Sequence, residues 1–262
     1  MLGLVLFASC SQSSSDGASD NTAGNSVATT FMPLTNGNWW AYKVQGQVPP
    51  ITRDSLYVKG DTLIGGTTFK KMKTRFAPTG FYSTTLRNNG IKVSGSSLIM
   101  SGSISISAGL PAPITLAATN FTFFKENASQ NDLLSTQSGT FNQTIQGYPL
   151  TFDYVLKSYF DGSLPTFTTT TNRTYADLKK TKVVLNLKIT YTQNVGGFPL
   201  TAVVLQPQDV VVSTQYYAKG KGMVYANTDI NYTLSSVPGV TLPIPSSGSQ
   251  NQKEFLDTFL VN

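Results

Sequence analysis

KVVLNLKITYTQ, residues 182–193, alternates apolar and polar side chains over most of its length, with Leu185, Leu187, Ile189 and Tyr191 on one face. A period of two predicts a β-strand with one buried face, because successive side chains of a strand point to opposite sides. About twelve such stretches, separated by turns rich in Gly, Asn and Pro, can be marked along the chain. The sequence therefore predicts an all-β fold: a large curved antiparallel sheet or a partly closed barrel, without crossover helices.

Turn residues predict several of the connections. Gly65-Gly66 indicates a tight hairpin between strands at 55–64 and 67–76, and Asn88-Asn89-Gly90 indicates another between strands at 81–87 and 91–94. The lysine-rich segment 69–76 is typical of an edge or surface strand, where Lys blocks edge-to-edge association. Residues 161–181, rich in Thr, are expected to form a long loop or a small helical insert near 175–179. The last recognisable strand covers 230–234.

The N-terminus has a different pattern. The apolar run MLGLVLFAS leads to Cys10, the sole cysteine, and small polar residues continue to about residue 30. Such a run is typical of a secretory signal and is far shorter than the roughly 20 apolar residues that span a bilayer. Phe7-Ala8-Ser9-Cys10 resembles a bacterial lipobox, which implies that Cys10 is lipidated. We therefore expect a lipoprotein signal segment and lipobox at 1–10, a flexible tether at 11–30 and a single β domain at 31–262.

The lipobox resemblance also implies a location. Ser11 follows Cys10, where Asp would be the usual inner-membrane retention signal, so the outer membrane is expected. The first acidic residue, Asp16, lies well behind the cysteine, which favours the periplasm-facing leaflet over the cell surface. The formal net charge is +6. In an exported lipoprotein this charge fits an anionic lipid surface nearby, or solubility alone, and no nucleic-acid partner is expected.

The chain lacks the residues on which most catalytic sites depend. It contains no His, which excludes Ser-His-Asp and Cys-His triads and the common zinc and haem ligand sets. Cys10 is assigned to the lipid, and no Walker loop, nucleophile elbow or EF-hand pattern occurs. A pair of carboxylates could still serve in glycoside cleavage, but no acidic residue lies in a recognisable motif. We expect no catalytic residues, no metal ligands, no cofactor and no enzymatic activity.

Four predicted hairpin tips place an apolar residue directly before Pro. Two of them belong to a repeat with a period of 50 residues, in which 141–151 matches 191–201. If all connections are antiparallel, the tips lie at one end of the sheet, and the connection with Lys219 and Lys221 is expected at that end too. The tips are candidates for an apolar mouth that contacts a ligand or a membrane; alternatively, their side chains fold under the sheet as plugs. The tip residues are Val48, Leu110, Tyr148 and Phe198.

Trp39 and Trp40 are the only tryptophans, and adjacent residues of a strand point to opposite faces, so one is expected in the core. Trp40 is a further candidate for ligand contact. The leading interpretation is a non-enzymatic, lipid-anchored envelope protein that binds an apolar ligand (a lipid or acyl chain) or a partner protein. The alternative is a glycan-binding accessory lipoprotein that uses exposed aromatic residues such as Trp40, Tyr42 or Tyr217.

Two ends of the chain resemble a group of Gram-negative envelope lipoproteins of unassigned activity. Residues 31–42, FMPLTNGNWWAY, resemble their Pro-Leu-x-x-Gly-Asn-x-Trp-x-Tyr opening. Residues 54–72 resemble their second segment, and YYAKGKGMV at 216–224 is similar to a late strand pair. The resemblance implies an envelope address and β architecture. The general layout is also similar to the half-barrel of lipoprotein-localisation carriers, which hold acyl chains in an apolar concavity.

Overall fold

The computed structural model describes residues 31–106, 113–238, 242 and 244–262. In these ranges one helix, α1 (Phe81–Leu86), accompanies twelve strands. The strands are β1 (Trp39–Gln45), β2 (Thr52–Ile64), β3 (Thr67–Thr74), β4 (Gly90–Ser94), β5 (Ser97–Ile106), β6 (Ile114–Lys125), β7 (Leu133–Ile145), β8 (Tyr148–Thr168), β9 (Thr174–Val195), β10 (Phe198–Ala218), β11 (Gly222–Thr233) and β12 (Ser247–Leu260).

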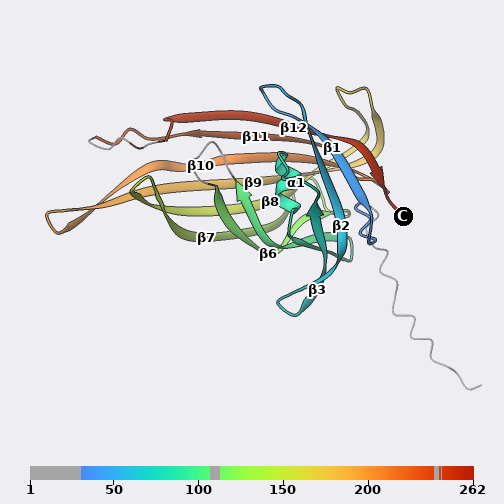
Figure 1. Cartoon of the computed structure of the whole chain (residues 1–262), viewed down its shortest axis with the longest axis horizontal. Coiled ribbons are helices and arrows are strands. Elements are labelled where there is room, and N and C mark those ends of the chain that lie inside the picture. Colours follow the sequence, from blue (N-terminus) through green and yellow to red (C-terminus); the bar gives the residue numbers. More distant parts are fainter. Residues whose placement is uncertain (1–30, 107–112, 239–241, 243) are drawn as a thin grey trace, which may run out of the picture.

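All strands belong to one antiparallel sheet, in the order β6-β5-β4-β3-β2-β1-β12-β11-β10-β9-β8-β7. The chain first builds one half outward from β1 to β6, and then builds the other half inward from β7 until β12 pairs with β1. Figure 1 shows the sheet curving around its interior, with long hairpins extending to one side. The predicted all-β class and the curved, nearly closed antiparallel sheet are confirmed.

The two outer strands of the sheet, β6 and β7, meet through side chains where a backbone ladder would otherwise close the barrel. The Gln137 amide on β7 accepts the backbone N–H of Thr119 on β6 at 3.2 Å and donates to the carbonyl of the same residue. A short way along the seam, the Ser158 hydroxyl on β8 donates to the carbonyl of Thr122. One amide side chain thus copies the two hydrogen bonds of a strand partner.

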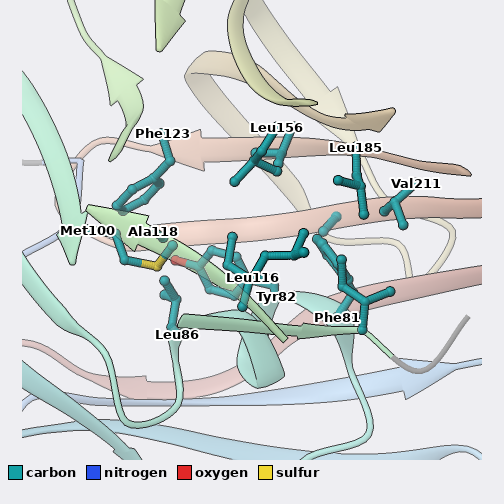
Figure 2. Packing of buried hydrophobic residues seen from close by; sticks show 14 of the residues in the cluster. Phe81, Tyr82, Leu86, Met100, Leu116, Ala118, Phe123, Leu156, Leu185 and Val211 are labelled. Atoms are coloured by element: carbon teal, nitrogen blue, oxygen red, sulfur yellow. The ribbon is translucent and has the colours of Figure 1, made fainter. Parts of the chain in front are cut away.

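A continuous apolar core fills the interior of the sheet. Its members come from both halves, including Leu98 of β5, Phe124 of β6, Phe152 of β8 and Leu185 of β9, all of them buried. Figure 2 shows α1 packed inside, with Phe81, Tyr82 and Leu86 against residues of the surrounding strands. Burial of large apolar side chains is the main favourable term for such a fold.

The helix α1 lies where a strand was predicted. Its sequence, FYSTTL, is rich in aromatic and β-branched residues, which favour strands. The local preference is overridden because side chains from β2 and β12 accept the backbone N–H groups at the start of the helix, and because five of its six residues are buried. The expected hairpin at 88–90 is therefore the return from α1 into β4.

Three further expectations differ from the structure. Residues 161–181, predicted as a loop or helical insert, form the ends of β8 and β9 around a turn at 169–173. Of the two alternatives for the lysine-rich strand β3, the edge position is wrong, because β3 lies between β2 and β4; its lysines are partly exposed, as in a surface strand. The last strand, β12, was missed because its first half is almost entirely polar and shows no alternation. It is held in place on both sides by β1 and β11.

Candidate functional site

The first cluster of polar groups holds α1 inside the barrel. The Asp54 carboxylate on β2 accepts the backbone N–H of Thr79 at 2.9 Å and that of Gly80 at 2.7 Å. On β12, Gln252 Oε1 accepts the N–H of Phe81 at 2.6 Å. Each of these N–H groups lacks a partner within the helix, because the first turn has no preceding carbonyls. The cluster therefore satisfies the start of a helix that is buried away from water.

Glu254 completes the cluster. Its Oε1 accepts the N–H of Tyr82 at 2.6 Å, and its Oε2 accepts the hydroxyl of Ser83 at 3.3 Å. Burial raises the pKa of Glu254 to about 7, the nearby Asp54 carboxylate adds to the rise, and the bonds from Tyr82 and Ser83 oppose it. A carboxyl with such a pKa can serve in catalysis. Here both of its oxygens are engaged by the chain, so the cluster is structural.

The interior has little free space beside this cluster. An apolar cavity of about 10 Å³ adjoins α1, and another of about 20 Å³ lies among residues of β8–β11. A larger hollow of about 330 Å³ lies where β11 leaves the sheet, lined by Val204, Leu234 and a row of serines. Ligand pockets for small molecules measure roughly 300–1,000 Å³. The two cavities inside the barrel are therefore far too small for an acyl chain.

The aromatic residues named for a glycan platform are in the core. Trp40 is 1 % exposed, and its Nε1 donates to the carbonyl of Lys221 at 2.6 Å. Tyr42 and Tyr217 are equally buried, and both lie close to Tyr82 of α1. Trp40 is thus corrected from a contact residue to a core residue. A glycan platform on Trp40, Tyr42 or Tyr217 is likewise ruled out by their burial.

The hairpin tips divide between the two alternatives that the sequence left open. Val48 and Phe198 are each 78 % exposed, so these tips present apolar side chains to solvent. Tyr148 is half-buried and packs against Tyr191 of β9, with ring centroids 5.6 Å apart, as a plug would. Leu110 and Cys10 lie outside the described residues. Figure 1 also shows the β9–β10 tip well separated from the β1–β2 tip, so these two do not share one mouth.

The connection with Lys219 and Lys221 lies at the opposite end of the sheet. Strand β10 begins at Phe198 and ends at Ala218, directly before Lys219. The sequence suggested two strands, at 200–205 and 210–217, where the structure has one strand with register shifts between Val203 and Val211. One extra strand in the count reverses the end at which every later turn falls. The expected basic residues beside the apolar tips are therefore not there.

Three of the connections at the end that carries Val48 and Phe198 lack charged residues. The β1–β2, β7–β8 and β9–β10 connections all lie at this end, because neighbouring strands are antiparallel throughout. No Lys, Arg, Asp or Glu occurs in residues 44–52, 133–152 or 189–208, which form these connections and the adjoining strand ends. We call these three stretches the neutral end.

The β9–β10 hairpin extends furthest within the neutral end. Strand β8 accompanies β9 only as far as the pair Leu150–Tyr191, and β10 meets β11 only from Val211. Residues 192–201 therefore pair only with one another, as a two-stranded ribbon that we call the β9–β10 arm. Its Phe198 and Leu200 are exposed. Sequence reasoning named Phe198 and missed Leu200. The signal that could have found Leu200 is the absence of charged residues between Lys188 and Asp209.

Other kinds of site are not indicated in the part of the chain that the structure covers. No group of three or more His, Cys, Asp or Glu residues in that part could hold a metal ion. Within the same residues, α1 is too short to cross a membrane, and no other helix of the required length and apolar character is found.

Comparisons with known proteins give little further information. No protein-family model matches the chain, and no curated protein matches it. Among solved structures, it is similar to the crystal structure of a protein from Parabacteroides distasonis that is provisionally classed as a lipoprotein. The TM-score is 0.36 at 10 % sequence identity, and the match covers 89 % of this chain and 99 % of that chain. A similarity of this size carries no argument about function.

Proposed function

We propose that this chain is a non-enzymatic, lipid-anchored protein of the bacterial outer membrane that contacts a lipid bilayer through its β9–β10 arm. The observation that carries the proposal is the arm itself: Phe198 is 78 % exposed at the tip of a ribbon without a charged residue between Lys188 and Asp209. The lipobox resemblance at Cys10 supplies the anchor. The filled interior favours contact through the surface over storage of an acyl chain inside.

The energetics of the arm favour a lipid environment. Transfer of a Phe or Leu side chain out of water contributes about 1.5–3 kcal/mol each. A Lys or Arg carried to the middle of a bilayer on a lipid-facing strand costs roughly 2–4 kcal/mol, and the arm carries none. Pairing across the ribbon from Thr192–Thr201 to Val195–Phe198 satisfies only the backbone groups that face the partner strand. The outward-facing groups of both strands have no strand partner, which favours contact of the exposed side chains with the bilayer surface over insertion of the whole ribbon.

Flotation with liposomes tests the arm. The full chain carrying Cys10→Ser, which removes the lipidation site, is expected to float with liposomes, and adding Phe198→Ser with Leu200→Ser is expected to reduce the bound fraction severalfold. Leu63→Ser is the matched control, because Leu63 is 72 % exposed and lies at the end of β2 that is away from the β1–β2 connection. Binding should change little with salt, since the arm has no charge to screen. Equal loss in the control, or no loss in the double variant, would refute bilayer contact through the arm.

The anchor is tested separately by labelling with radioactive palmitate in a bacterial host. Incorporation is expected in the wild-type chain and should be absent in Cys10→Ala. Density separation of the membranes then reports whether the labelled protein is in the outer or the inner membrane. Label that persists in Cys10→Ala would remove the anchor from the proposal while leaving the arm to stand on the flotation result.

A further inference from the structure

The outer face of the sheet carries a hollow that the proposed bilayer contact does not use. It measures about 560 Å³ and lies over β8, β9 and β10, with a wall from the loop between β6 and β7. Its floor is apolar, since Val155 of β8 and Val184 of β9 face it and Val184 is buried. The volume is within the range of small-molecule sites. We call it the outer groove.

Polar groups stand around this floor in paired sets. At one end the Asp161 carboxylate forms ion pairs with Lys180 at 3.2 Å and with Lys182 at 3.5 Å. At the other end Asn186 donates to Asp209 at 2.8 Å. Both carboxylates keep lone pairs for further donors, and the amide and ammonium groups keep hydrogens for further acceptors. The outer groove can therefore bind a ligand that both donates and accepts, as neighbouring hydroxyl groups do.

Lys157 stands between the two sets without a counterion. It faces the groove from β8, directly opposite Val184 in the strand register. No ion pair or hydrogen bond of its side chain is found among the described residues, whereas Lys180, Lys182 and Lys188 all pair with Asp. An ammonium over an apolar floor favours a negatively charged group of the ligand at this point.

Tyr159 adds an aromatic ring beside Lys157. It lines the same groove two residues further along β8, on the same face of the strand. Its ring takes part in none of the aromatic contacts found in the described chain, unlike Tyr148, Tyr154 and Tyr216. A free ring next to amide and carboxylate groups suits the apolar face of a sugar ring.

We infer that the outer groove binds a saccharide that carries an acidic group, with the acid at Lys157, a ring face at Tyr159 and hydroxyls at Asn186 and Asp209. A simple inorganic anion fits less well, because it has no ring face for Tyr159 and no hydroxyl groups to donate to Asp209. An added peptide strand fits less well too, because β9 is already paired on both sides throughout this region and β8 is paired on both sides as far as Tyr159.

Titration calorimetry with the full chain tests the groove. The probes are the dimer of galacturonic acid and its methyl ester, which differ only in the acidic groups. The acid is expected to bind at least about tenfold more tightly, and Lys157→Gln should bring its affinity down to that of the ester, as expected for one charge-assisted contact. Lys188→Gln is the matched control, since Lys188 pairs with Asp153 outside the groove at 3.7 Å and should leave affinity unchanged.

A second variant keeps the interpretation clear. Tyr159→Leu is expected to weaken both probes severalfold, with thermal unfolding measured to show that the fold is retained. Equal affinity for the acid and the ester in the wild type, or equal losses in Lys157→Gln and Lys188→Gln, would overturn the inference. Neither outcome bears on bilayer contact by the arm, because none of these substitutions lies in residues 192–201.

Discussion

The Oε1 atom of Glu254 accepts the backbone N–H of Tyr82 at 2.6 Å, although the two residues are 172 positions apart in the chain. The bond joins the last strand of the sheet to a helix enclosed by it. Asp54 does the same from β2, so strands from the beginning and the end of the domain converge on one buried turn. The stability of the fold should therefore respond to changes at this cluster more than to changes at surface charges.

The pH dependence of stability is the first expected consequence. The pKa of Glu254 is about 7 in the folded chain against a usual 4.5, so the folded state binds more protons between these values. The stabilisation that Glu254 gains from this raised pKa is fully present below about pH 4.5 and is lost as the pH rises through 7. Urea unfolding should show a lower free energy of unfolding at pH 8 than at pH 5, by on the order of 3 kcal/mol. Glu254→Gln should flatten this difference, and an unchanged pH profile in that variant would contradict the assignment.

Removal of the Glu254 carboxylate should destabilise the fold strongly. Glu254→Ala leaves the N–H groups of Tyr82 and Ser83 buried without an acceptor, and each orphaned group costs about 1–3 kcal/mol. Asp153→Ala is the control, because Asp153 forms a half-exposed ion pair with Lys188, and such pairs contribute about 0–1 kcal/mol. The loss in the free energy of unfolding, measured in urea, should be several-fold larger for Glu254→Ala than for Asp153→Ala. Similar losses in both would show that the cluster is not special.

Gly80 should not tolerate a side chain. A Cβ added there would meet the Glu254 carboxylate and lie 2.9 Å from Asp54 Oδ2. Gly80→Ala therefore has to displace one carboxylate from the helix, and overpacking of this kind costs about 1–3 kcal/mol or more. Gly46→Ala is the matched control, since the nearest atom to its added Cβ is 3.8 Å away. Thermal unfolding should show a clear drop in Tm for Gly80→Ala alone; a Tm equal to that of Gly46→Ala would contradict this packing.

The seam between β6 and β7 should depend on one amide. Gln137→Leu keeps a similar volume but removes both hydrogen bonds to Thr119. Because these bonds are solvent-exposed, the expected loss is about 0.5–1.5 kcal/mol. Hydrogen exchange at the Thr119 amide should become faster, because its acceptor is gone. Gln143→Leu, on the same face of the same strand but without a side-chain bond among the described residues, should leave exchange at Thr119 unchanged. Slow exchange in Gln137→Leu would mean that other contacts close the seam.

The sequence was most informative where local pattern and final environment agree. The alternation at 182–193 and the two matching segments at 141–151 and 191–201 do form paired hairpins, with Leu150 beside Tyr191. It was least informative where contacts distant in the chain decide. FYSTTL at 81–86 favours a strand by composition. It becomes a helix because Gln252 and Glu254 accept its first N–H groups, Asp54 accepts those just before it, and five of its six residues are buried.

The candidate contacts show the same division. Phe198 could be placed at a tip from its Gly and Pro neighbours, and it is exposed there. Trp40 could not be placed, because the choice between Trp39 and Trp40 for the core depends on which face of β1 meets Tyr82 and Lys221. The neutral end was visible in the sequence as uncharged stretches, but their common location required the correct number of strands.

Closure of the barrel by Gln137 also has a consequence for self-association. Strands β6 and β7 run antiparallel to one another, so the free edge of each is complementary to the other. If the seam opened, β6 of one molecule could pair with β7 of the next, and the contact would leave a free edge at both ends of the growing chain. Such head-to-tail contacts build open-ended fibres when their rotation does not close a ring. The side chains of Gln137 and Ser158, which hold this seam, thus protect the protein from polymerisation through its own sheet.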